Sequence, residues 1–156
     1  MQELAVQRRM VEVAIRLPGQ EVVRGHLFLA LTAKGHAGPE TVLDLMNEAE
    51  PFFVLRVEGQ PPVRLVNKDQ VVEIEVDSAE AGGGSQDSAA VAKEEEMAVS
   101  FRDGFVLEGK ALVEMPPTKS RLIDFLNHSD RFFVLVGQDR AHIVNRRHIV
   151  QITPGR

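Results

Sequence analysis

The sequence predicts a mainly β protein with short helices, built as two tandem five-stranded barrels, each with one short helix, that a flexible linker joins. Three observations lead to this prediction. One set of short motifs occurs twice in the same order. The runs around these motifs alternate apolar and polar residues, which is the period of a half-buried strand. Between the two sets lies a segment of Gly, Ser, Ala and acidic residues with almost nothing to bury.

The duplication sets the domain boundaries. Three pairs of segments match: Val42–Asn47 with Leu122–Asn127, Phe52–Leu55 with Phe132–Leu135, and Val66–Val71 with Val144–Ile149. We therefore expect one barrel over residues 10–76, a flexible linker over 77–95 and a second barrel over 96–154. A lone domain of about 60 residues buries only about 60% of its unfolded surface, so the copies should pack on each other or on a partner.

Each copy begins with a predicted hairpin. In the first copy, alternation over 11–15 leads through a turn to a long strand over 22–31. In the second copy, strands over 97–101 and 105–115 flank Asp103-Gly104, a good hairpin signal. Gly25 and Gly109 fall at equivalent places in the second strand, which predicts the bulge or bend that closes a small barrel.

A short helix follows the hairpin. Apolar residues at i, i+3 and i+4 over 42–47 and 122–127 give one stripe in each copy. The aligned acids Asp44 and Asp124 are expected on the solvent side of this helix.

The remaining strands complete the predicted barrel. Continuous apolar runs over 52–57 and 132–136 are typical of strands buried on both faces. A tight polar turn at 67–69, and again at 145–147, then separates two short strands. Five short strands with a glycine bend favour a strongly bent barrel over an open sheet.

The closing segments, Val66–Val71 and Val144–Ile149, resemble the tight link between the last two strands of Sm-like and other SH3-like small barrels. The bent strand that carries Gly25 or Gly109 is similar to the second strand of that class. The resemblance implies an SH3-like or Sm-like barrel for each copy. The copies also resemble an uncharacterised bacterial domain with an aliphatic-Asp-aliphatic-Leu-Asn helix before a Phe-Phe strand, which implies no function.

Composition excludes several classes of function. The chain has no cysteine, which excludes disulfides, thiolate zinc sites and thiol nucleophiles. No apolar run approaches the roughly 18 residues of a membrane span, so we expect a cytoplasmic protein without a membrane partner. Residues 10–76 carry ten acidic and six basic residues, a charge of −4, and residues 96–156 carry seven and nine, a charge of +2. This basic footprint is weak for a nucleic-acid-binding domain.

The candidate binding residues cluster near the closing turns. Asn67 and Asn145 match between the copies, and an Asn side chain at this position either caps its own turn or contacts a ligand. The basic cluster of the second copy is Arg121, Arg140, Arg146, Arg147 and His148. Two interpretations of this cluster remain open, a solvated turn and a contact for an acidic partner or RNA.

No catalytic residue and no cofactor is assigned. His128, His142 and His148 lack a third ligand with recognisable spacing, so no metal is expected. We therefore expect a non-enzymatic tandem module for protein interaction or assembly, with a protein partner or a homo-oligomer. The first alternative is an Sm-like RNA-binding protein that uses the basic turn of the second copy. The second is a small-molecule sensor with a ligand groove between the copies.

Overall fold

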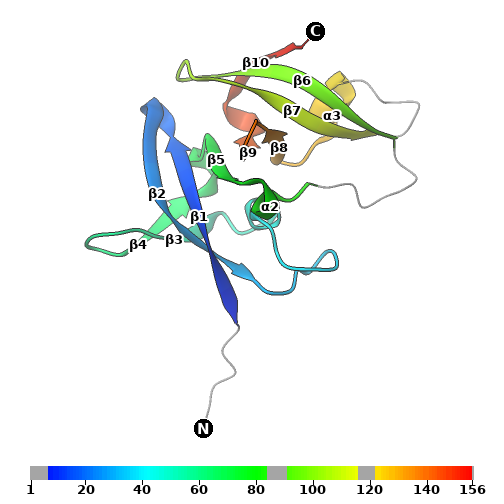
Figure 1. Cartoon of the computed structure of the whole chain (residues 1–156). Helices are drawn as coiled ribbons and strands as arrows, with labels where there is room; N and C mark the ends of the chain where they lie inside the picture. The colour runs from blue at the N-terminus through cyan, green and yellow to red at the C-terminus, as the bar shows by residue number, and fades with distance from the viewer. Residues whose placement is uncertain (1–6, 84–90, 116–121, 156) are drawn as a thin grey trace.

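The computed structural model describes residues 7–83, 91–115 and 122–155, which form ten strands and three short α-helices (Figure 1). The first repeat contains β1 (Arg8–Leu17), β2 (Glu21–Ala30), α1 (Val42–Asn47), β3 (Phe52–Arg56), β4 (Val63–Asn67) and β5 (Glu73–Asp77). Helix α2 (Ser78–Ala81) follows it. The second repeat contains β6 (Val91–Phe101), β7 (Val106–Met115), α3 (Leu122–His128), β8 (Phe132–Val136), β9 (Arg140–Asn145) and β10 (Ile149–Pro154).

All ten strands belong to one antiparallel sheet in the order β10-β6-β7-β8-β9-β5-β1-β2-β3-β4. The two repeats therefore have the same internal order, because each places its last strand beside its first and its fourth strand at the far edge. Strand β9 of the second repeat pairs with β5 of the first over five residue pairs. The predicted duplication and the mainly β class are seen in this arrangement.

The architecture differs from the predicted pair of closed barrels, because the strands form one continuous open sheet. The free side of β5 pairs with β9 instead of closing onto β4 of its own repeat. Two copies joined in this way satisfy one another's backbone groups, which a single copy of this size leaves exposed on an edge strand. Within the described sheet, β4 and β10 are the edge strands.

The sequence predicts a bulge or bend at Gly25 and Gly109, but the pairing of β1 with β2 and of β6 with β7 runs through both glycines without a bulge. What both glycines allow is a close approach of β2 and β7 to the next strand. A Cβ atom on Gly25 would lie 2.4 Å from the carbonyl oxygen of Arg56. A Cβ atom on Gly109 would lie 2.8 Å from the carbonyl oxygen of Val136. Glycine is therefore required in both copies by the close approach of two backbones.

The hydrophobic core consists of two clusters, and each draws on both repeats. The cluster of the first repeat includes Phe132, Ala141 and Ile143, which β8 and β9 of the second repeat contribute. The cluster of the second repeat includes Val72, which lies just before β5. The repeats thus share their interiors, which follows the expectation that two such small copies pack on each other.

The connection between the repeats is more ordered than the sequence predicts. Of the expected linker over 77–95, residues 78–81 form α2 and residues from 91 onward belong to β6. Ala81 is buried in the first cluster, which gives this helix an apolar anchor. Residues 84–90 lie outside the described part of the chain. Among the described residues, no helix has the length and apolar content that crossing a membrane requires.

Candidate functional site

Both predicted asparagines cap their turns. Asn67 Oδ1 accepts a hydrogen bond from the Asp69 backbone N–H at 2.9 Å, and Asn145 Oδ1 accepts one from Arg147 at 3.0 Å. Asn145 has a second role, because its buried side-chain nitrogen donates to the Val71 carbonyl at 2.9 Å. Asn145 thereby joins the two repeats, whereas Asn67 is the last residue of the edge strand β4.

The side chain of Arg146 caps the C-terminal end of α3. Its Nη1 donates to the carbonyl oxygens of Leu126 and Ser129 at 3.1 and 2.7 Å, at the C-terminal end of α3. Lys68 does the same in the first repeat, where Nζ donates to Leu45 at 2.7 Å and Glu48 at 3.1 Å. Burial lowers the pKa of the Lys68 ammonium, although the Glu48 carboxylate opposes this shift. Each cation donates hydrogen bonds to carbonyl groups at the C-terminal end of a helix, where the regular backbone donors of the helix stop.

The other predicted basic residues do not converge on one surface. Arg140 lies at the start of β9, about 17 Å along the strand from the Arg146 turn. Its Nε is 3.4 Å from Glu75 Oε1. His148 Nε2 is 2.7 Å from the Asp69 carbonyl oxygen, across the contact between the repeats. Arg147 is exposed, and Arg121 lies outside the described residues.

The sequence predicts that Asp44 lies on the solvent side of α1, but the structure shows its carboxylate in hydrogen bonds with two neighbouring residues. Its carboxylate accepts a hydrogen bond from the Thr41 backbone N–H at 2.8 Å, and Thr41 Oγ1 accepts one from the Asp44 N–H. His36 Nε2 lies 2.6 Å from the same carboxylate. Burial raises the pKa of Asp44, but the hydrogen bonds from His36 and Thr41 outweigh it and lower the pKa overall. The acid therefore caps the start of α1.

The contact between the repeats is built from paired polar and apolar groups. Asn47, at the end of α1, donates to the Phe132 carbonyl at 3.1 Å and accepts from the Phe132 N–H at 2.9 Å. The Phe132 side chain is buried in the first cluster. His142 Nδ1 lies 3.1 Å from Glu73 Oε2, and the Glu73 side chain is buried. One asparagine thus holds both backbone groups of a residue whose ring enters the other repeat.

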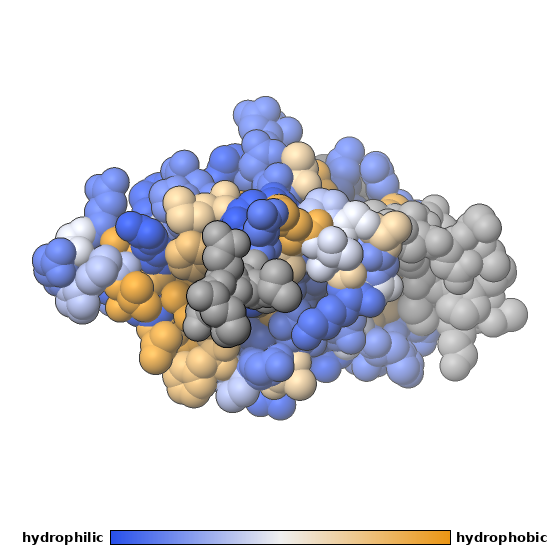
Figure 2. Space-filling model, turned by 90° about the horizontal axis from the view of Figure 1, so that it is seen from below, coloured by the Kyte–Doolittle hydropathy of each residue, from blue (hydrophilic) through white to orange (hydrophobic). Residues whose placement is uncertain are grey.

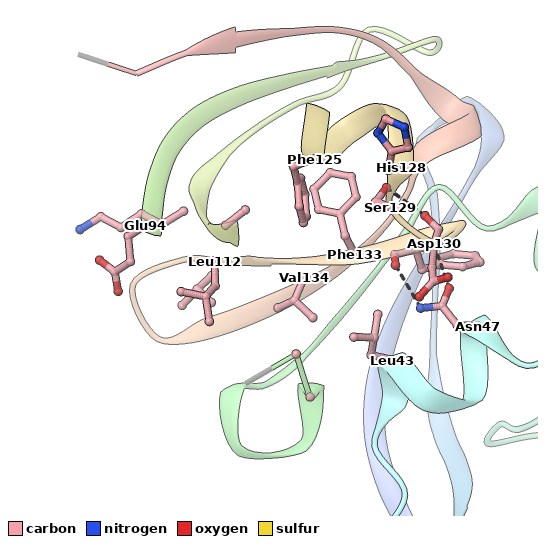
Figure 3. Close-up of a pocket in the computed structure, with 16 residues that line it drawn as sticks. Leu43, Asn47, Glu94, Leu112, Phe125, His128, Ser129, Asp130, Phe133 and Val134 are labelled. Atoms are coloured by element: carbon pink, nitrogen blue, oxygen red, sulfur yellow. Dashed lines mark hydrogen bonds between the residues drawn. The ribbon is translucent and has the colours of Figure 1, made fainter. Parts of the chain in front are cut away.

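A groove of about 570 Å³ lies beside this contact (Figure 3). Leu43 and Val134 approach from opposite repeats, and Phe125 and Phe133 meet edge to face with ring centroids 5.8 Å apart. His128, Ser129 and Asp130 line one end. The groove is mostly apolar with a polar end, the composition of a small-molecule site.

The outer face of β3 and β4 is an exposed apolar surface. Phe52, Val54, Val63 and Leu65 have 55%, 42%, 46% and 70% of their surface exposed. Val54 and Leu65 stand directly opposite each other on the two strands. In Figure 2 apolar side chains gather on the left of the view, the side on which β3 and β4 lie in Figure 1. We call these four residues the β3–β4 face.

A smaller pocket of about 400 Å³ lies in the second repeat between α3 and β10. We call it the α3–β10 pocket; its lining is Ile123, Leu126, Asn127, Arg146, Ile149 and Ile152. Next to it Val150 on β10 is 63% exposed. Among the described residues, no three His, Asp or Glu side chains gather as metal ligands here or elsewhere.

Sequence reasoning missed the β3–β4 face. The apolar run over 52–57 predicts a strand buried on both faces, and β8 matches this pattern, since Phe132 and Phe133 are both buried. Strand β3 instead alternates exposed and buried residues. The two runs have almost the same sequence, so nothing local in the run distinguishes the covered copy from the uncovered one.

Comparison of the chain with protein-family models, with curated proteins and with solved structures finds no match. The features of the structure that bear on function are the β3–β4 face, the α3–β10 pocket and the groove.

Proposed function

We propose that the chain is a non-enzymatic protein-interaction and assembly module that binds a second polypeptide at the β3–β4 face. The observation that carries the proposal is the set of four large apolar side chains exposed on an edge strand and its neighbour. Contiguous exposed apolar surface of this kind marks interaction sites in folded proteins.

The backbone supports the same proposal. Strand β4 pairs only with β3 in the described sheet, so its outer side offers unpaired N–H and C=O groups. An added strand would bind these groups, while its side chains cover Val63 and Leu65. Pairing at an edge supplies affinity through the backbone and specificity through the side chains.

A photo-crosslinking experiment tests this function. A photoreactive phenylalanine analogue placed at Leu65, in cells that naturally make the protein, should give a covalent adduct with another polypeptide, identified by mass spectrometry. The matched control carries the same analogue at Glu12, an exposed position on β1, which β2 separates from β3 and β4 in the sheet. Adducts at neither position, or equal adducts at both, would contradict a binding role for this face.

The groove between the repeats favours a second candidate function, a small-molecule sensor. Its walls come from both repeats, so a bound molecule would change the free energy of their contact. Filling the groove with Val134→Trp should abolish any rise in melting temperature that a library of small apolar molecules produces. The matched control is Val54→Trp, the equivalent position on β3, which lies outside the groove. A library that shifts none of the melting temperatures would speak against this second candidate.

The RNA-binding alternative depends on the basic turn of the second repeat. Arg146 is occupied by helix carbonyls and Arg140 lies at the other end of β9. Retention on RNA at low salt that Arg147→Glu abolishes would support this alternative.

A further inference from the structure

We infer that the partner is a second copy of the same chain: the β3–β4 face of one copy inserts into the α3–β10 pocket of the next, repeating head to tail the contact between its own two repeats. This inference rests on the proposed function and names the partner of the β3–β4 face. In Figure 1 the edge strands β4 and β10 lie far apart, with β4 at the left of the view and β10 at the top.

The internal contact is the template. In it, β9 of the second repeat pairs with β5 of the first, with Ile143 opposite Ile74 and His142 opposite Glu75. Phe132, Ala141 and Ile143 enter the core of the first repeat. Strand β9 is the fourth strand of its repeat and β5 is the fifth strand of its own. The edge strands β4 and β10 are the remaining fourth and fifth strands, so they form a matching unpaired couple.

The inserting side chains have exposed equivalents in the first repeat. The repeat alignment places Phe52 at the position of Phe132, Val63 at Ala141 and Leu65 at Ile143. Their exposed fractions are 55%, 46% and 70%, against 1%, 1% and 0% for the inserted residues. All three equivalents remain large and apolar. The first repeat therefore exposes apolar side chains at the three positions where the second repeat buries them.

The receiving pocket has a filled counterpart. Leu126, Asn127, Ile149 and Ile152 of the α3–β10 pocket align with Met46, Asn47, Val71 and Ile74. Met46, Val71 and Ile74 are fully buried in the cluster that also holds Phe132, whereas the second repeat has a pocket of about 400 Å³ in the same place. Val150 is 63% exposed and its equivalent Val72 only 2%. The second repeat lacks the side chains that complete the first.

The polar groups of the template are also present at the free surfaces. Asn47 binds both backbone groups of Phe132, and the equivalent residues are Asn127, which is exposed, and Phe52. Asn145 donates across the internal contact to Val71, and its equivalent Asn67 would donate to Ile149 of the next copy. The hydrogen bonds of a buried contact therefore have donors and acceptors ready on both sides.

The register of the internal contact, applied to β4 and β10, predicts which residues of two copies face each other. It places Leu65 opposite Ile152 and Arg64 opposite Thr153 of the next copy, as Ile143 lies opposite Ile74 and His142 opposite Glu75. Pro154 has no N–H to give, so the added ladder is confined to residues before it. Charge agrees with the pairing, because the contact joins a repeat of charge −4 to one of charge +2.

The proposed contact uses two different surfaces, so one such contact between two chains leaves one surface of each kind free. Such a head-to-tail contact generates a closed ring when its rotation divides a full turn, and an open chain otherwise. A half-turn rotation closes the ring at two chains, and any other rotation leaves a face and a pocket free on a dimer and so gives a larger product.

Sedimentation velocity on the full-length protein tests the inference, over about 1 µM to about 1 mM, which spans interfaces of ordinary affinity. The wild type should associate into a ring or an open chain of two or more copies. Leu65→Lys should block the β3–β4 face and Val150→Lys the pocket side, so each variant alone should be monomeric. A mixture of the two variants should form a one-to-one dimer, because one intact face and one intact pocket remain. Val22→Lys, at an exposed position on β2, is the matched control and should assemble like the wild type.

A disulfide experiment checks the register independently of these lysine variants. The chain has no cysteine, so oxidation of an Arg64→Cys, Thr153→Cys double variant should join neighbouring chains covalently, into a ladder or, where the ring closes at two chains, into a dimer with two disulfides. Arg64→Cys alone should give at most covalent dimers.

Monomeric wild type over the whole concentration range, or unchanged assembly in both lysine variants, would overturn the inference. If wild type is monomeric while Leu65 crosslinks in cells to a different protein, the proposed function stands and the partner named here is wrong. If both experiments fail, the β3–β4 face is not a binding surface.

Discussion

At the scale of single residues, a cation caps the C-terminal end of the helix in each repeat. Lys68 and Arg146 occupy equivalent positions and donate to the last carbonyl groups of α1 and α3. The sequence shows these residues as parts of polar turns, and Arg146 as part of a candidate basic surface. Their role in the fold depends on where the helix ends come to lie, which the sequence of the turn does not contain.

Replacement of Lys68 should therefore cost stability. We expect Lys68→Met to lower the free energy of unfolding by about 2–3 kcal/mol, because it leaves two partly buried carbonyl groups without a charged donor. Lys68→Arg is the matched control, since Arg performs this role in the second repeat, and it should lose less. Urea unfolding followed by circular dichroism measures both; equal losses would show that the cation is not what matters at this position.

A pair of acids gives the first repeat a dependence on pH. The hydrogen bond to Glu40 and burial raise the pKa of Glu48 to about 6. The folded chain therefore holds this proton up to about pH 6, whereas the unfolded chain releases it near its ordinary pKa of 4.5. Stability from this group is present below pH 4.5 and is lost as the pH rises to about 6.

Glu48→Gln should remove that dependence. We expect the variant to be more stable than the wild type at pH 7.5, by up to about 1 kcal/mol after solvent screening, with the gain vanishing near pH 4.5. Urea unfolding at the two pH values measures the difference. A gain of the same size at both would assign it to something other than the proton.

At the scale of elements, Gly25 and Gly109 lie in strands whose register shows no bulge, and each allows a close approach to the neighbouring strand. Gly25→Ala should destabilise the fold by about 1–3 kcal/mol, because its Cβ would meet the Arg56 carbonyl at 2.4 Å. Gly35→Ala is the matched control, since nothing lies within 4 Å of a Cβ there. Thermal unfolding compares the two, and a similar melting temperature for both variants would contradict the steric argument.

At the scale of the whole molecule, two phenylalanines that stand in nearly identical local sequence have opposite surroundings. Phe132 is buried in the core of the other repeat, whereas Phe52 is exposed. Phe132→Ala should lower the free energy of unfolding by about 3–5 kcal/mol, the usual cost for a buried phenylalanine. Phe52→Ala should cost far less in a Leu65→Lys background, where the chain is expected to be monomeric.

Denaturant unfolding of both variants, monitored for each repeat, gives the readout. Because the repeats share their cores, Phe132→Ala should shift the unfolding of both repeats together. Separate transitions for the two repeats, with only the second one shifted, would show that the shared core does not couple them.

Much of the fold and part of the candidate site could be predicted from the sequence. The two asparagines were named from their repetition, and their turn-capping role follows from local chemistry. The β3–β4 face could not be predicted, since Phe52 and Phe132 stand in almost the same local sequence. Their difference in exposure arises from pairing between segments far apart in the chain.

The sequence by itself determined the tandem repeat, its strands and short helices, and the two equivalent glycines of the second strand. These features depend on local periodicity, turn chemistry and sterics. Only the tertiary structure decided that the repeats share one open sheet, which copy covers the other, and which fourth and fifth strands stay at the edges. Both copies carry the same apolar pattern, so the local sequence does not decide which copy is covered. Pairing between distant segments decides it, and a chain with two copies can form that contact only once.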